Sequence, residues 1–333
     1  MEPLYILTGA AGHLGSAVLQ TLKGAGSRVR ALVLPSERNK IKEAGIEVIT
    51  GNVLEPDSLK PLLRGINGDD VRVIHAAGIV SIASKTNPAV HDVNVEGTRN
   101  ILRLCKENDV GKLVYVSSVH AIPEKPHGET ILETADFNPE SVNGDYAKTK
   151  AEATCAVLDA AASGLNASVV HPSGILGPYD EGNNHLNTMV IDYCRGKLSV
   201  GVRGGYDFVD VRDVADGVVS CCEKGRPGEC YILANKYFTV AELLKALSEI
   251  TGLREIKSIL PLWFAKLTAP LAELYYKVRR QQPLFTAYSL YTLSSNAEFS
   301  HEKAEKELGF HPRELAETLR DTIAWLRQKR VLA

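Results

Sequence analysis

Short apolar runs alternate with amphipathic segments along the first half of the chain. Runs rich in Val, Ile and Leu occupy residues 4–9, 28–34, 46–51, 71–78, 112–118 and 167–177. Between these runs, apolar residues recur at helical spacing, which predicts helices at about 13–24, 36–44, 57–65, 88–108 and 144–163. Near-continuous apolar strands separated by helices are typical of a parallel sheet that is covered on both faces. The pattern therefore predicts an α/β fold with a doubly wound, Rossmann-type sheet, whose ligands bind beyond the carboxyl ends of the strands.

Composition narrows the class of protein further. The chain has 333 residues, of which 44% are hydrophobic and 23% charged, and its formal net charge is −2. Basic runs are short, so neither nucleic acid nor an anionic membrane surface is an expected partner. The N-terminal stretch lacks a basic region followed by an apolar core, and the six cysteines form neither a CxxC pair nor a zinc-spaced cluster with histidines. We therefore expect a cytoplasmic protein with reduced thiols and without a metal site.

Three glycines at intervals of three follow the first predicted strand. Gly9, Gly12 and Gly15 stand in the sequence TGAAGHLG, between that strand and the first helix. Without side chains, backbone amides can approach a pyrophosphate, and the N-terminal end of the helix favours its negative charge. A plain tight turn is the alternative. The position between strand and helix favours a dinucleotide site, although the spacing is GxxGxxG rather than GxGxxG.

Tyr146 precedes Lys150 by one helical turn. Both lie in a segment of strong helix formers, so their side chains are predicted to share one face. An ammonium about 4–6 Å from a phenol favours the phenolate and brings its pKa down toward the working range of an acid–base catalyst. An isolated pair with this spacing is more often a half-buried tyrosine beside a solvated lysine. Other motifs of the chain are therefore needed to distinguish a catalytic pair from a chance spacing.

Six motifs occur in the order in which one enzyme superfamily carries them. They are TGAAGHLG (8–15), HAAG (75–78), VNVEGT (93–98), YVSS (115–118), the Tyr146–Lys150 pair and HPSGILGP (171–178). In these motifs, which span the N-terminal two-thirds, the chain resembles the extended short-chain dehydrogenases/reductases. That superfamily includes sugar-nucleotide epimerases and dehydratases, dihydroflavonol reductases and 3β-hydroxysteroid dehydrogenases. The resemblance implies a Rossmann fold and a nicotinamide cofactor.

The resemblance also implies roles for a catalytic group. Tyr146 would transfer the proton at the reacting carbonyl or alcohol, and Lys150 would supply charge and bind the nicotinamide ribose. Ser118 would hold the substrate oxygen, with Ser117 as its competitor for that role. Asn94 would support the lysine through backbone and water, although a polar residue that satisfies a helix bend is an equal alternative.

A set of residues along the cofactor follows from the same resemblance. They are Gly9, Gly12, His13, Leu14, Gly15, Leu34, Arg38, Asn52, Val53, Ala76, Ala77, Gly78, Ser117, Tyr146, Lys150, Pro172, Ser173 and Gly174. His171 stands where relatives usually carry Arg and is expected to be structural. Asp213, in a loop that would border the substrate region, is interpreted first as a helix cap.

The choice between NAD and NADP depends on the end of the second strand. An acid there would bind the ribose diol and repel a 2′-phosphate, but the strand ends in Val33 and Leu34. Ser36, Arg38 and Lys40 follow and could hold a phosphate, or could simply begin a solvated helix. The sequence thus favours NADP(H) slightly over NAD(H).

The last third of the chain carries the substrate information. Residues 258–278 are apolar, aromatic and prolyl, and Trp263 and Leu267 belong to one apolar helical face. The closing pattern at 299–326 resembles that of 3β-hydroxysteroid dehydrogenase-like members. We expect residues 258–278 to form a wall of the substrate pocket. The alternative is a helical hairpin that packs on the domain. Charged and prolyl residues interrupt the segment, so it is not expected to span a membrane, while a peripheral membrane contact and a homodimer stay open.

Together these observations predict an oxidoreductase that moves hydride between a nicotinamide and a ketone or secondary alcohol on a largely apolar ring compound, such as a steroid or flavonoid. A sugar-nucleotide epimerase or dehydratase with tightly bound NAD is the alternative enzyme, and a non-catalytic dinucleotide sensor is the alternative of another class. We predict a dinucleotide-binding domain over residues 1–178 and about 206–235, and a smaller, mainly helical substrate region over 179–205 and 236–333.

Overall fold

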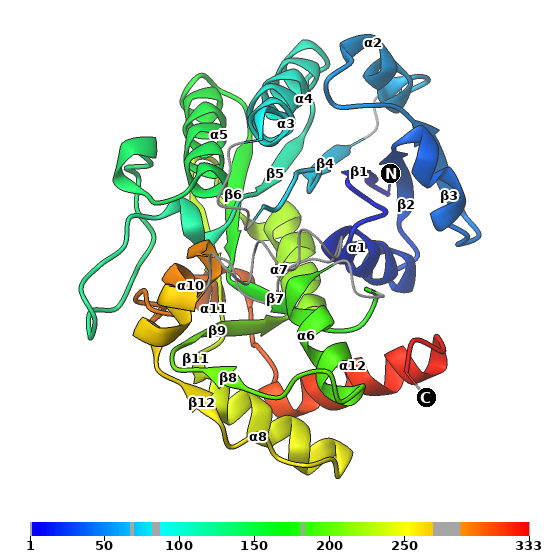
Figure 1. The fold of residues 1–333 in the computed structure, drawn as a ribbon. Helices are drawn as coiled ribbons and strands as arrows, with labels where there is room; N and C mark the ends of the chain where they lie inside the picture. The colour runs from blue at the N-terminus through cyan, green and yellow to red at the C-terminus, as the bar shows by residue number, and fades with distance from the viewer. Residues whose placement is uncertain (1, 67–69, 82–86, 181–183, 269–286, 333) are drawn as a thin grey trace.

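Seven parallel strands form the central sheet of the computed structural model (Figure 1), which describes residues 2–66, 70–81, 87–180, 184–268 and 287–332. The strands are β1 (Leu4–Thr8), β2 (Arg28–Val33), β3 (Ile46–Thr50), β4 (Val71–His75), β5 (Lys112–Val116), β6 (Ala167–Pro172) and β10 (Cys230–Leu233). Their order across the sheet is β3-β2-β1-β4-β5-β6-β10, so the sheet grows in one direction from β1 to β3 and in the other from β4 onward. Ligands of doubly wound sheets bind at such a reversal. The predicted Rossmann-type fold is confirmed.

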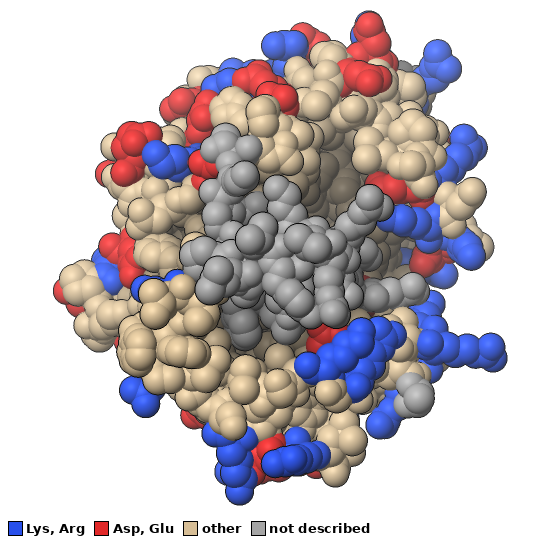
Figure 2. Space-filling view, viewed as in Figure 1, with Lys and Arg blue, Asp and Glu red and all other residues tan. Residues whose placement is uncertain are grey.

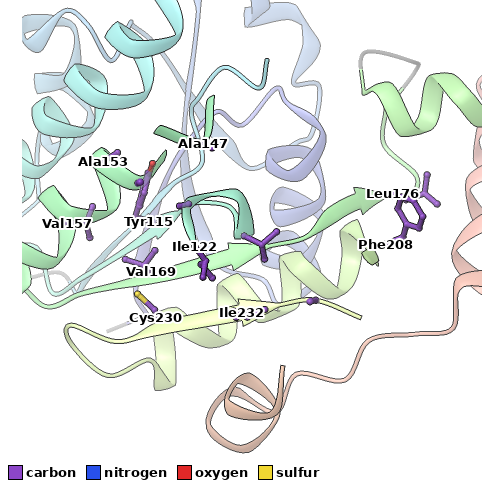
Figure 3. Packing of buried hydrophobic residues seen from close by; sticks show 14 of the residues in the cluster. Tyr115, Ile122, Ala147, Ala153, Val157, Val169, Leu176, Phe208, Cys230 and Ile232 are labelled. Atoms are coloured by element: carbon purple, nitrogen blue, oxygen red, sulfur yellow. The ribbon is translucent and has the colours of Figure 1, made fainter. Parts of the chain in front are cut away.

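Helices cover both faces of this sheet. On one face lie α1 (His13–Gly24), α7 (Val211–Lys224) and α11 (Glu302–Leu308), and on the other lie α4 (Gly97–Glu107) and α5 (Asp145–Ala162). Successive strand residues enter opposite cores, as Ile6 and Leu7 do, and both are fully buried. Figure 3 shows part of the core under α5, where Tyr115, Val157 and Val169 gather from β5, α5 and β6. Burial of both faces explains why the strands read as continuous apolar runs.

Two predicted helices are shorter than expected, and a third is interrupted. Residues 36–44 form only η1, a 3-10 helix at Pro35–Lys40 that buries none of its residues, so no packing extends it. Residues 57–65 form α2 (Pro56–Leu59) and then a 3-10 turn, η2 (Lys60–Leu63), because Pro61 lacks the amide that would continue an α-helix. The segment 88–108 divides into α3 (Pro88–His91), a π-helical turn η3 (Asp92–Glu96) and α4.

A second, smaller region lies below the main sheet in Figure 1. It contains a three-stranded sheet, β11 (Tyr237–Thr239), β9 (Gly205–Asp210) and β7 (Gly174–Leu176), and a pair of short strands, β8 (Gly201–Val202) and β12 (Ile259–Leu260). Its helices are α6 (His185–Cys194), α8 (Val240–Thr251), α10 (Ala287–Thr292) and α12 (Leu315–Gln328). Within the predicted range 206–235, α7 and β10 complete the main body, whereas β9 joins the smaller sheet. The boundary between the two domains stays a prediction.

Acidic and basic side chains are mixed along the upper rim of the face in Figure 2, and Lys and Arg gather at its lower right. Within the described ranges, the structure contains no helix with the length and apolar character needed to cross a bilayer.

Candidate active site

The glycine-rich loop joins β1 to α1 in a conformation that other residues would not allow. Gly9 has φ +70°, and a Cβ on it would lie 2.7 Å from the backbone nitrogen of Ala77. A Cβ on Gly15 would lie 2.0 Å from the carbonyl oxygen of Gly9, so α1 can approach the loop only because Gly15 has no side chain. Gly12 is the N-cap of α1 and offers no side chain to its first amides. These amides and the helix dipole are therefore directed at the space beyond the loop, as a pyrophosphate site requires.

A chain of buried hydrogen bonds ties the ends of β1 and β4 together at the reversal of strand order. The Thr8 hydroxyl lies 2.7 Å from Nδ1 of His75, whose Nε2 lies 3.0 Å from the Thr98 hydroxyl. The amide of Ala77 donates to Thr8 Oγ1 at 3.1 Å. Burial, assisted by the charge of Lys150, lowers the pKa of His75 to about 3, so its ring is neutral and serves as a structural bridge. This network fixes the loop Ala76–Gly78 against the glycine-rich loop.

Asn94 holds the next part of the same loop. From the π-helical turn η3, its Oδ1 accepts from the amide of Ile79 at 2.8 Å, and its Nδ2 donates to the Ile79 carbonyl at 3.1 Å and to the Thr149 hydroxyl at 3.1 Å. A Cβ on Gly78 would lie 3.0 Å from Asn94 Oδ1 and 3.5 Å from Lys150 Nζ. Asn94 thus positions the 76–79 loop and α5 beside Lys150, which agrees with a supporting role and not with direct contact at the reacting atoms.

Lys150 points from α5 into the interior beneath the ends of β4 and β5. Its Nζ donates to the carbonyl oxygen of Val116 at 2.8 Å and lies 4.9 Å from the ring centroid of Tyr115. Among the described residues, no carboxylate forms an ion pair with it. Burial consequently lowers the pKa of Lys150 to about 7.

Tyr146 lies one turn earlier on α5, next to the Ser118 hydroxyl. Burial raises the pKa of Tyr146 to about 12, and the neighbouring Ser118 hydroxyl offsets only part of that rise. The expected lowering of this pKa by Lys150 is absent from the described structure, where burial, which disfavours the phenolate, dominates the shift. The isolated site holds Tyr146 as a neutral phenol.

The two serines at the end of β5 point to different places. The Ser117 hydroxyl lies 2.7 Å from that of Thr154, which in turn donates to the carbonyl of Lys150 at 2.7 Å. Ser118 instead faces Tyr146. The structure brings Ser118 to Tyr146 and turns Ser117 toward the body of α5.

Other predicted cofactor residues surround the same edge of the sheet. Leu14 is buried at the start of α1, and His13 Nε2 lies 2.8 Å from the carbonyl of Pro178, which links the glycine-rich loop to the chain just after β7. Burial lowers the pKa of His13, so it stays neutral there. Asn52 caps its own turn by accepting from the Leu54 amide at 3.0 Å, and Val53 is buried.

At the end of β2, Leu34 is 43% exposed and Arg38 lies on the exposed turn η1. Arg38 donates to Thr50 Oγ1 at 3.5 Å and forms no ion pair with any described residue, whereas Lys40 is paired with Glu37 at 2.9 Å. Arg38 is therefore the better placed of the two cations to receive an anionic ligand.

At the end of β6, the Ser173 side chain points away from the predicted cofactor position. The Ser173 hydroxyl donates to the buried carboxylate of Asp207, so that side chain is directed to β9. A Cβ on Gly174 would lie 2.8 Å from the Asp207 carbonyl, which explains the glycine where β7 meets β9, directly after Pro172 and Ser173. His171 is buried, stacks on Phe137 at 5.1 Å and has a structural position, as expected.

Two predictions for the last part of the chain are wrong for the residues that the structure describes. The N-cap of α7 is Asp210, whereas Asp213 accepts from the backbone amide and the side chain of Arg313 at 2.7 and 2.8 Å, and so ties α7 to the chain before α12. Trp263 and Leu267 are 68% and 69% exposed and face solvent, so they do not wall a pocket. The segment 262–268 packs on the domain through Leu262 and Ala265, and residues 269–278 lie outside the described residues.

An aromatic cluster beside Tyr146 was not anticipated from the sequence. His120 lies on the short turn η4 (Val119–Ala121), with ring centroids 6.1 Å from Tyr146, 5.6 Å from Tyr206 and 5.9 Å from Tyr288. It also lines a cavity with residues of several elements, Val119, Ile122, Glu124, Ile131, Ser141, Val142, Asn143, Tyr206, Tyr291, Ser295, Asn296 and Phe299. The one sequence signal was the position of His120, two residues after Ser118.

Comparison with known proteins identifies the class of enzyme. Residues 5–234 match the model of the NAD dependent epimerase/dehydratase family, and the chain belongs to this family. It is an enzyme of the extended short-chain dehydrogenase/reductase type, a class that uses a nicotinamide dinucleotide.

Individual relatives and a solved structure match over nearly the whole chain. "Sterol demethylase protein B" of Methylococcus capsulatus is 29% identical over 329 residues, 97% of this chain and 98% of that protein. The 4-hydroxy-2-methyl-3-oxo-4-farnesyl-3,4-dihydroquinoline-1-oxide ketoreductase of Stigmatella aurantiaca is 29% identical over 313 residues, 91% of this chain and 90% of that protein. The crystal structure of gox2253 superposes with a TM-score of 0.85 at 32% identity, over 99% of both chains.

The residues at the sheet edge fit a nicotinamide dinucleotide. Gly9 and Gly15 create a cradle that a Cβ would fill, the first amides of α1 lack a side-chain cap, and Lys150 lies beside Gly78 at the reversal of strand order. When bound, the nicotinamide supplies the carbon that donates or accepts hydride.

Proposed function

We propose that the protein transfers hydride between NADP(H) and a ketone or secondary alcohol on a largely apolar ring compound, with Tyr146 as the general acid and base. The observation that carries this proposal is the placement of the buried Ser118 hydroxyl beside Tyr146, one helical turn from the buried Lys150. In ketone reduction both hydroxyls would bind the carbonyl oxygen, and Tyr146 would donate its proton as negative charge develops there. Lys150 would hold the ribose and Asn94 would position its surroundings.

The lining of the cavity beside His120 supports a substrate of low charge. It contains one carboxylate, Glu124, and no Lys or Arg among the described residues that form it. The diphosphate of a sugar nucleotide would need cations near the site. Two full-length relatives carry names that refer to a sterol and to a farnesylated ring ketone with a hydroxyl on the neighbouring carbon. These observations favour the apolar ring compound over the sugar nucleotide.

The preference for NADP(H) rests on Arg38. No acid stands at the end of β2 to repel a 2′-phosphate, and Arg38 is exposed there without a carboxylate partner in the described chain. A guanidinium binds phosphate in two parallel hydrogen bonds, which a ribose hydroxyl cannot match.

Replacing Tyr146 by Phe tests the catalytic part of the proposal. The variant should lose several orders of magnitude in kcat for ketone reduction while keeping its Kd for NADPH, because only the proton-transferring oxygen is removed. Tyr193→Phe on α6 is the matched control, since the one partner of its hydroxyl among the described residues is the carbonyl of Arg254, at 3.2 Å. A Tyr146→Phe enzyme as active as the control would refute the assignment. A dehydrogenase should also exchange its cofactor freely, so NAD retained in native mass spectra would point instead to an epimerase.

A further inference from the structure

The carbonyl oxygen of Ser118 lies where the ladder between β5 and β6 ends. In the described structure, the last backbone hydrogen bond of that ladder runs from the Ser117 amide to the Val170 carbonyl, at 2.8 Å. Pro172, at the end of β6, has no amide hydrogen and cannot extend the ladder. The chain leaves the sheet at Ser118 in an extended conformation, with φ −163° and ψ 153°. The Ser118 carbonyl therefore needs hydrogen-bond donors from outside the ladder.

Two donors meet at this carbonyl oxygen. The Ala121 amide donates to it at 3.0 Å and closes the short turn η4, and Nδ1 of His171 approaches it at 3.0 Å as well. Because a carbonyl oxygen can only accept, Nδ1 carries the hydrogen of the His171 ring. A side chain of β6 thus holds the residue after β5 that the backbone ladder no longer reaches.

The packing around His171 fixes the direction of its ring. The ring is parallel to that of Phe137, with an interplanar angle of 4° and 5.1 Å between the centroids, and both side chains are buried. On its other side, the backbone of β6 pairs His171 with Ile232 of β10. The ring therefore has little freedom to turn away from Ser118.

The second nitrogen of this ring shows what the histidine costs the fold. Nε2 is buried and has no hydrogen-bond partner among the described residues. Burial lowers the pKa of His171 to about 4, so the ring is neutral at pH 7 and Nε2 is an unmatched acceptor. A buried polar atom without a partner is destabilising, and a phenylalanine would stack on Phe137 without that penalty. The hydrogen bond that Nδ1 makes to Ser118 accounts for a histidine at this position.

The turn η4 couples the carbonyl of Ser118 to its hydroxyl. Ser118 is the N-cap of this turn, and its hydroxyl accepts from the amide of His120 at 3.3 Å. Its carbonyl accepts from Ala121 at the other end of the same turn. A displacement of the carbonyl would therefore move the turn, and with it the hydroxyl that lies beside Tyr146.

We propose that His171 is a positioning residue, which holds the Ser118 carbonyl and so directs the Ser118 hydroxyl toward the oxygen of the reacting ketone. The inference rests on the proposed hydride transfer, in which Ser118 and Tyr146 bind that oxygen together. His171 acts through Ser118 and transfers no proton itself. Misplacement of a reacting group by about 1 Å can cost about 100-fold in rate, so loss of the hydrogen bond from His171 should lower kcat.

Reduction of 1-tetralone, flavanone and cholestanone, followed by NADPH absorbance, tests this role. His171→Phe keeps the stack on Phe137 but cannot donate to Ser118. Its kcat should fall about 10–100-fold, while KM and the Kd for NADPH change by less than about threefold.

Two amide variants separate positioning from packing. His171→Asn places an amide nitrogen near the position of Nδ1 and should recover most of the lost kcat, whereas the amide nitrogen of His171→Gln is one bond further out and should not. Urea unfolding of both variants gives their stabilities. Because asparagine fills less of the space beside Phe137 than glutamine does, a purely structural role predicts the opposite order of activity.

A double-mutant cycle with Ser118→Ala tests whether His171 acts through the serine. In the Ser118→Ala background, His171→Phe should lower kcat by no more than about twofold, since the hydroxyl that it positions is already absent. His301→Phe is the matched control and should keep the wild-type kcat. Like His171, His301 has a buried ring nitrogen without a partner among the described residues, and its ring meets Phe310 at the start of α11.

The possible failures are distinguishable. A wild-type kcat in His171→Phe, full additivity in the double variant, or a glutamine variant as active as the asparagine variant would each overturn this inference and leave the proposed hydride transfer intact. If His171→Phe does not fold, the comparison of the two amide variants still decides. Failure of wild-type enzyme to reduce any of the three ketones with NADPH or NADH would refute the proposed function, and this inference with it.

Discussion

Replacing Lys150 by Met should make the cofactor-free protein more stable at pH 7, although it removes a residue that the proposed reaction needs. Lys150 is 5% exposed, it has no carboxylate partner among the described residues, and its amine bonds the Val116 carbonyl. Methionine fills a similar volume without bringing a charge into the interior. An active-site residue that is costly to the fold is a frequent consequence of selection for function.

The size of the effect follows from the lowered pKa of Lys150. Between the ordinary value of 10.5 and about 7, the folded state binds fewer protons than the unfolded chain, so stability rises with pH across that window. The cost of burying the amine is fully present below pH 7; at pH 7 it is about 4 kcal/mol, and at pH 9 about 2 kcal/mol. Loss of the hydrogen bond to Val116 offsets about 1–3 kcal/mol of the gain at either pH. We expect Lys150→Met to be more stable than wild type by about 1–3 kcal/mol at pH 7.

Urea unfolding at pH 7 and pH 9 measures the stability difference between Lys150→Met and wild type directly, on protein shown by absorbance to be free of nucleotide. The advantage of the variant should shrink by about 2 kcal/mol between the two pH values, and this difference does not depend on the lost hydrogen bond. Lys148→Met is the matched control on the same helix, because Lys148 is only partly buried and pairs with Glu140 at 3.1 Å. Its effect should stay within about 0.5 kcal/mol at both pH values. A stability difference for Lys150→Met that is the same at pH 7 and pH 9 would refute the reasoning.

Three further outcomes are expected. Gly15→Ala should destabilise the protein by about 1–3 kcal/mol in urea unfolding and weaken dinucleotide binding, because its Cβ would lie 2.0 Å from a backbone oxygen. Its control is Gly24→Ala, whose Cβ would meet nothing within 4 Å; this variant should be neutral or stabilising by up to about 1 kcal/mol. Arg38→Ala should weaken NADPH binding in calorimetry by about 1–3 kcal/mol and leave NADH nearly unchanged; equal losses for both cofactors would contradict a phosphate contact. The double variant Trp263→Ala and Leu267→Ala should keep the wild-type KM for a ring ketone and change stability by no more than about 1 kcal/mol, since both side chains are exposed. A large rise in KM would show instead that these side chains contact the substrate.

The fold and the cofactor edge could be predicted from the sequence because each depends on local pattern. Continuous apolar runs specify a sheet buried on both faces, and glycines at a strand–helix junction have few other uses. The order of the strands then brings Gly9, Gly78, Ser118 and Lys150 to one edge without further information. Interruptions such as the π-helical turn that carries Asn94 have no comparable local signature.

The contacts that shape the substrate side join distant parts of the chain. His120 meets Tyr206 across 86 residues and Tyr288 across 168, and Asp213 meets Arg313 across 100. No periodicity relates such pairs, and a single sequence provides no other signal for them. The exposure of Trp263 could not be foreseen for a related reason, since an apolar helical face does not reveal which neighbour covers it.

Burial has opposite consequences for the two partners of the central pair, and this favours one direction of the reaction. Desolvation raises the pKa of Tyr146 to about 12 and lowers that of Lys150 to about 7, because in each case the charged form is the one disfavoured. A neutral phenol beside the Ser118 hydroxyl can donate a proton to a developing alkoxide, which is what ketone reduction by the proposed mechanism requires. Alcohol oxidation needs the phenolate, and the interior of this protein works against its formation below about pH 12. Under the proposed mechanism, the neutral phenol of the cofactor-free protein therefore suits ketone reduction at neutral pH, and oxidation would depend on charge that the bound cofactor brings to the site.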